Sequence, residues 1–175
     1  KVYIDPNSKI NKDSTITLTL DVKNTGNYAG KDVIQLYGFT PYFKGQIEKS
    51  SIQLVAFEKT DLLNPGETQK DIKLSFNLYG LASYDAYDKN KNGHKGYELD
   101  KGTYTFKLMN NWKKKKNLDD YLGNSISFDL EETINYSKDP TTENTVENRF
   151  TALNSYASTP IDGSSVNIDQ NYLTR

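Results

Sequence analysis

The chain has no cysteine and only one histidine, His94, among its 175 residues. Without thiols it can form no disulfide bond and no zinc–thiolate site, and it has no cysteine nucleophile. A metal site built on several imidazoles is excluded as well. No recognisable catalytic motif surrounds His94, and its polar neighbours predict an exposed side chain.

Apolar residues are also scarce. They make up 35% of the chain, and the mean hydropathy is -0.77. The longest apolar run is a few residues, so neither a transmembrane helix nor a signal peptide is expected. A net charge of -1 favours neither nucleic acid nor membrane insertion. The first residue is Lys1 rather than Met, which indicates a piece of a longer protein.

What the chain does have is strand-like alternation, together with 13 tyrosines. Apolar residues alternate with polar ones in Thr15–Lys23, Thr68–Asn77 and Gly102–Met109, the pattern of half-buried antiparallel strands. Shorter strands are predicted at 31–37, 54–63, 81–87 and 125–130. Turn residues separate these segments, at Asn24-Thr-Gly26 and Asn64-Pro-Gly66 for example. Seven or eight short strands at this spacing predict an all-β, immunoglobulin-like antiparallel sandwich.

The composition changes at Glu131. From there on the chain is rich in Asn, Ser and Thr, acidic residues outnumber basic ones, and apolar residues are scattered. We therefore expect a sandwich domain over residues 1–130 and an irregular, extended C-terminal connector over 131–175.

Several motifs in this order resemble the fibronectin type III-like domain that accompanies the catalytic domains of glycoside hydrolase family 3. They are Asn24-Thr-Gly26, Gly30-Lys-Asp32, Val33–Tyr37, Pro41-Tyr42, Phe57-Glu-Lys59, Leu63–Glu67, Tyr84-Asp85 and Gly102-Thr-Tyr104. The stretches 41–57 and 88–99 are similar to those of circularly reordered members. In such enzymes the β-sandwich lies between an α/β sandwich domain and a barrel domain, and a connector like residues 148–175 enters the barrel.

The resemblance implies a non-catalytic accessory domain that supports and orients catalytic domains of the same parent chain. The parent would be a bacterial, β-glucosidase-like enzyme of carbohydrate metabolism, cytoplasmic or on the cell surface, with carbohydrate at its active site. The family's nucleophile lies in a Ser-Asp-Trp-like motif of the barrel, and this sequence has no such motif. No catalytic residue is assigned, so the fragment alone is not expected to be an enzyme. The alternative is a free-standing surface carbohydrate-binding or adhesion module.

Two segments suggest sites. The loop over residues 39–50 is long for a hairpin and carries aromatic side chains, which favours contact with another surface. Tyr42, Phe43, Lys44, Ile47, Glu48 and Lys49 are the predicted interdomain residues, near the rim of a substrate pocket; the other interpretation is a loop folded onto its own sandwich.

The second segment, Asp88-Lys-Asn90-Lys-Asn92-Gly93, is similar to the front half of a calcium loop. Its twelfth position falls on Leu99, which cannot bind a cation. We therefore predict a polar turn and no cofactor, with a weak calcium site at Asp88, Asn90 and Asn92 as the alternative. The acid pairs Asp119-Asp120 and Glu131-Glu132 and the lysine run 113–116 beside Trp112 are interpreted as solvated surface.

Overall fold

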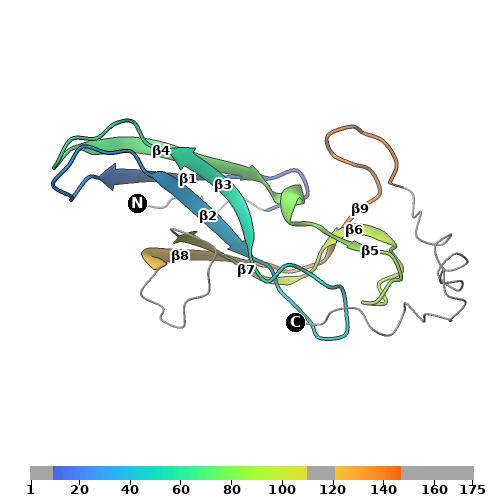
Figure 1. Ribbon diagram of the computed structural model, residues 1–175. Coiled ribbons are helices and arrows are strands. Elements are labelled where there is room, and N and C mark those ends of the chain that lie inside the picture. The colour runs from blue at the N-terminus through green and yellow to red at the C-terminus, as the bar shows by residue number, and fades with distance from the viewer. Residues whose placement is uncertain (1–9, 110–120, 147–175) are drawn as a thin grey trace, which may run out of the picture.

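The computed structural model describes residues 10–109 and 121–146, shown in colour in Figure 1. Within these residues the chain forms nine strands and one short 3-10 helix. They are β1 (Thr15–Lys23), β2 (Val33–Phe39), β3 (Gln53–Lys59), β4 (Thr68–Asn77), η1 (Leu78–Leu81), β5 (Ser83–Asp85), β6 (Gly96–Leu99), β7 (Gly102–Met109), β8 (Tyr121–Leu130) and β9 (Ile134–Tyr136).

One layer of the sandwich is the antiparallel pair β1–β4. The predicted alternation holds: Leu18 and Leu74 face each other, each 1% exposed, and point into the core. On the opposite face the hydroxyls of Thr17 and Ser75 lie 2.8 Å apart. The period-two pattern therefore places an apolar face inward and a hydrogen-bonded polar face outward.

The second layer is a four-stranded antiparallel sheet with the order β3-β2-β7-β8. Its inward side chains include Leu36, Tyr104 and Phe106, all at most 1% exposed. Phe106 meets Phe76 of the first layer with ring centroids 4.9 Å apart. Figure 1 shows the β1–β4 pair as a layer apart from β7 and β8. One contiguous core between these layers confirms the predicted all-β sandwich.

A tyrosine fixes the corner where β6 turns into β7. The hydroxyl of Tyr104, early in β7, donates a 2.8 Å hydrogen bond to the backbone carbonyl of Asp100. Immunoglobulin-like sandwiches have this arrangement, the tyrosine corner, at the equivalent strand. Burial, and next the charge of Asp100, raises the pKa of Tyr104 above its ordinary value, so the donor stays protonated.

A small third sheet, β5-β6-β9, lies at one end of the sandwich (Figure 1). Sequence analysis missed β6 and β9, because it read the polar stretch between the strands predicted at 81–87 and 102–109 as one elongated turn. The turn is present at residues 88–93, but Gly96–Leu99 is a strand that pairs with β5 on one side and β9 on the other. The two missed strands have four and three residues, too few for a period to be visible.

β9 lies beyond the expected domain boundary at residue 130. Its Tyr136 is 3% exposed and donates a 3.0 Å hydrogen bond to the carbonyl of Lys12. The division into a sandwich and a following connector stays a prediction, and the connector's residues 147–175 lie outside the described part of the chain. In the part that is described, no helix is long and apolar enough to span a membrane.

We predict that Tyr104→Phe lowers the free energy of unfolding by about 1–2 kcal/mol, because the buried carbonyl of Asp100 loses its donor while the ring remains. Urea denaturation at neutral pH measures the change. Tyr28→Phe is the matched control, since Tyr28 is 87% exposed. Equal stabilities for the two variants would contradict a structural role for the corner.

Candidate functional site

The loop over residues 39–50 is anchored to its own domain at several points. Ile47 is 4% exposed, and Tyr42 donates a 3.1 Å hydrogen bond to Oε1 of Glu48. Pro41 packs against Gly102, where an added Cβ would lie 2.9 Å from the proline Cβ. Gly102 also has a φ of +132°, so both its backbone and its surroundings require glycine.

The strongest anchor is an ion pair in the interior. Lys49 of the loop forms a salt bridge with Asp100, and the two side chains are 3% and 5% exposed. Taking both charges out of water is costly, and their mutual attraction repays that cost only while both partners are present. The ion pair therefore fixes the loop relative to the corner between β6 and β7.

Two more acids are buried beside this pair, Asp85 of β5 and Glu98 of β6, at 2% and 0% exposure. Asp85 accepts backbone N–H groups from Tyr87 at 3.0 Å and Lys89 at 2.7 Å. The backbone N–H groups of the turn that follows β5 therefore compensate the negative charge of Asp85. We call Lys49, Asp85, Asn90, Asn92, Glu98 and Asp100 the polar cluster.

Glu98 is held by two amides. Nδ2 of Asn90 donates to one carboxyl oxygen and Nδ2 of Asn92 to the other, each at 2.6 Å. Burial raises the pKa of Glu98 above its ordinary value, and the charges of Asp100 and Asp85 raise it further. The bonds from Asn92 and Asn90 act in the opposite direction, since they favour the carboxylate.

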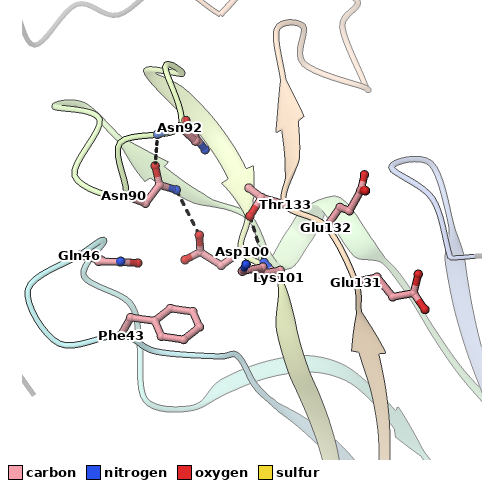
Figure 2. Close-up of a pocket in the computed structure, with 9 residues that line it drawn as sticks. All are labelled: Phe43, Gln46, Asn90, Asn92, Asp100, Lys101, Glu131, Glu132 and Thr133. Carbon is pink, nitrogen blue, oxygen red and sulfur yellow. Dashed lines mark hydrogen bonds between the residues drawn. The ribbon is translucent and has the colours of Figure 1, made fainter.

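A pocket of about 510 Å³ opens beside the polar cluster (Figure 2). Phe43 and Gln46 of the loop form one wall; Asn90, Asn92 and Asp100 lie across from them. Lys101 and the segment 131–133, which joins β8 to β9, complete the lining. Thr133 closes this side, because its Oγ1 accepts the backbone N–H of Lys101 at 3.2 Å.

The six predicted interdomain residues divide into two groups. Phe43, 42% exposed, and Lys44 face solvent. Ile47 and the Lys49 side chain are buried in their own domain, and Tyr42 bonds to Glu48 within the loop. An interdomain role for this loop stays a prediction, and its exposed tip is the part available for it.

The turn at 88–93 uses its side chains locally. The Asp88 carboxylate accepts the backbone N–H groups of Asn92 and Gly93, at 2.8 and 3.1 Å. Oδ1 of Asn90 accepts from Asn92, and Oδ1 of Asn92 accepts from His94. These oxygens thus serve the turn itself. No group of three or more metal-ligating His, Cys, Asp or Glu residues occurs in the described ranges, and the calcium alternative stays a prediction.

His94 is partly buried, not exposed as expected. Its Nε2 has no hydrogen-bond partner among the described residues, and its ring lies against Gly96. An added Cβ at Gly96 would lie 2.7 Å from that nitrogen. Glu131 and Glu132 are exposed, as predicted, whereas Trp112, the lysines 113–116 and Asp119-Asp120 lie outside the described residues.

Sequence analysis did not single out Asp85, Glu98 or Asp100 as a cluster. Glu98 and Asp100 flank Leu99, the twelfth position of the calcium-loop pattern. One usable signal was the alternation itself, since acids two residues apart in a strand share a face. Leu99 between them is 1% exposed, so both faces of this short strand are buried.

Comparison with known proteins identifies the fold. The model of the fibronectin type III-like domain matches residues 32–111. β-Glucosidase A of Butyrivibrio fibrisolvens is 37% identical over 93 residues, which are 53% of this chain and 11% of that protein.

Solved structures give the same result. A β-glucosidase from Paenibacillus barengoltzii matches 77% of this chain with a TM-score of 0.61 and 30% identity. β-Glucosidase 3B from Thermotoga neapolitana, in complex with α-D-glucose, matches 77% with a TM-score of 0.53 and 28% identity. The matched part is 14% and 15% of those chains.

The sandwich, its tyrosine corner and the family match together define a fibronectin type III-like domain. The domain is of the kind carried by multidomain β-glucosidases of glycoside hydrolase family 3, which confirms the resemblance. The chain spans only about a tenth to a seventh of the lengths of these relatives.

We predict that Lys49→Met destabilises the domain by about 3–5 kcal/mol at pH 7, because it leaves buried carboxylates without their cation. Lys49→Met/Asp100→Asn should recover most of the loss, since it removes the unpaired charge as well. Chemical denaturation measures both, with the exposed Lys101→Met as control. A double variant no more stable than Lys49→Met would show that packing, not charge, is what matters.

Glu98 should make stability fall as pH rises. Its pKa is raised in the fold, so the folded state holds the proton more tightly than the unfolded chain. Its contribution is fully present below the unfolded value near 4.5 and is lost as pH rises through the folded pKa. The stability of the wild type relative to Glu98→Gln should therefore decrease from pH 4 upward in denaturation series. Glu58→Gln, at an exposed site, should show no such trend; a difference that grows with pH would contradict the assignment.

Proposed function

We propose that this domain is a non-catalytic accessory domain that supports and orients the catalytic domains of a parent glycoside hydrolase. The parent would hydrolyse O-glycosyl bonds, with a β-glucoside as the substrate class. The observation that carries the proposal is the pattern of coverage: 77% of this chain matches only 14–15% of two β-glucosidase chains. A segment of that size in a multidomain enzyme is one domain among several.

The buried acids support a structural role. Glycoside hydrolysis needs two carboxyl groups that flank a substrate bond, one of them free to deliver a proton. Here Asp100 pairs with Lys49, and both oxygens of Glu98 accept amide hydrogen bonds. Each of these carboxyl groups is committed to holding a turn or loop in place, so the geometry favours a scaffold.

The proposed orienting surface is the exposed tip of the loop, with Phe43 and Lys44 at its centre. The anchors behind it give this tip a fixed position, because Ile47 is buried and Lys49 is paired in the interior. In the proposed parent, residues 1–130 form the sandwich, and 131–175 lead toward a barrel domain that follows, as in the reordered members of the family. A rigid tip on the sandwich suits contact with a neighbouring domain.

We predict that the purified 175-residue chain releases no p-nitrophenol from p-nitrophenyl β-D-glucoside, whereas the whole parent protein does. Colorimetric assays at equal molar concentrations compare the two. The coding sequence downstream should encode a barrel domain with a Ser-Asp-Trp-like motif. Turnover by the chain alone would overturn the non-catalytic assignment, and a parent without a barrel would overturn the accessory one.

The orienting role has its own test in the parent. Phe43→Ala/Lys44→Ala should lower the melting temperature of the catalytic domains or reduce kcat/KM. The substitutions remove the two side chains proposed to contact those domains, and they leave the buried anchors of the loop in place. Tyr28→Ala, in the connection between β1 and β2, is the exposed control. If the double variant and the control are alike in both measurements, the loop tip does not orient the catalytic domains.

A further inference from the structure

We propose that the pocket beside the polar cluster binds one pyranose ring of a neutral sugar. This site lies beyond the scaffold role and does not depend on it. The pocket joins three segments that are distant in sequence: the 39–50 loop, the 88–101 region and the connection from β8 to β9. Figure 2 shows the Phe43 ring and the Gln46 amide on one side and Asn90, Asp100 and Thr133 across from them.

The floor of the pocket is pre-organised. Asn90 bridges two acids, since its Nδ2 donates to Glu98 at 2.6 Å and to Asp100 at 3.3 Å. Asp100 is in turn fixed by Lys49, and Thr133 by the backbone of Lys101. A site whose polar groups are already held by their neighbours loses little conformational entropy when a ligand binds.

The walls offer what a sugar ring needs. The Phe43 side chain is 42% exposed and provides an apolar plane for the C–H face of a pyranose. The lining also has side chains that can donate to or accept from hydroxyl groups: the Gln46 amide, the Lys101 ammonium and, at the rim, the carboxylates of Glu131 and Glu132, which Figure 2 shows pointing away from Phe43. In the described part of the chain, no hydrogen bond engages the side chains of Gln46, Glu131 or Glu132, so these remain available.

Other ligand classes fit less well. An anion such as a phosphate would meet Asp100, Glu131 and Glu132 with Lys101 as the one cation of the lining. An apolar ligand would have a single aromatic wall, and the remaining lining is polar. A volume of about 510 Å³ is in the range of small-molecule sites. A neutral polyhydroxy ring is the class that satisfies both the aromatic plane and the polar rim.

The test is a titration of the 15N-labelled 175-residue chain with methyl β-D-glucopyranoside, followed by amide chemical shifts. We expect saturable shifts in the amides of Phe43, Gln46 and Lys101, with a dissociation constant on the order of millimolar for one small polar ring. Sorbitol, an acyclic polyol, serves as the control ligand. Shifts that do not saturate, or that sorbitol reproduces, would overturn the proposal.

Substitutions inside and outside the pocket test where the sugar binds. Phe43→Ala should weaken binding by roughly three- to tenfold, the value of an aromatic contact. Phe57→Ala is the matched control: Phe57 is 66% exposed on β3, outside the pocket lining, and should bind as the wild type does. Gln46→Ala is the second pocket variant, and wild-type affinity in both pocket variants would refute the site. Failure here leaves the accessory role intact, because that role is tested by hydrolysis and by the stability of the parent.

Discussion

Asp100 is the residue on which both the corner of the sandwich and the candidate site depend. Its backbone carbonyl accepts the hydroxyl of Tyr104, which fixes the entry to β7. Its carboxylate pairs with Lys49 and accepts from Asn90, so it also holds the 39–50 loop and the 88–93 turn. One residue thus connects the core to every segment that builds the pocket except the connection from β8 to β9.

The charge balance around Asp100 explains why this arrangement is specific. Three acids are buried, and Lys49 is the one cation in the polar cluster. Amides supply the remaining partners: backbone N–H groups for Asp85, and the side chains of Asn90 and Asn92 for Glu98. Such a network contributes little net stability relative to an apolar core, but a loop conformation that separated Lys49 from Asp100 would leave a buried charge unpaired. The polar cluster therefore disfavours such conformations of the loop.

The long strands could be predicted from the sequence because their alternation extends over eight to ten residues. The structure confirms three of them with the predicted bounds. β6 and β9 could not be predicted in this way, since strands of four and three residues are too short to show an alternating pattern. The candidate site was harder to predict than these short strands. Asp88, Asn90 and Asn92 were recognised as a group, but their spacing cannot show that the amides point at a buried Glu98, which depends on β5, β6 and β9 pairing first.

The small sheet packs onto the core at this end of the sandwich, and that packing links the two roles proposed for it. Tyr79 of η1 packs edge-on against Tyr136 and Tyr97, with ring centroids 4.8 and 5.7 Å apart, and so joins β9 and β6 to the core. Burial, followed by the charge of Asp139, raises the pKa of Tyr79 to about 12, so its hydroxyl remains a donor to that carboxylate. The loop tip is thereby connected through Lys49 and Asp100 to a packed core. Under the two proposals, this connection would hold the tip in place against a neighbouring domain and keep the walls of the pocket in position.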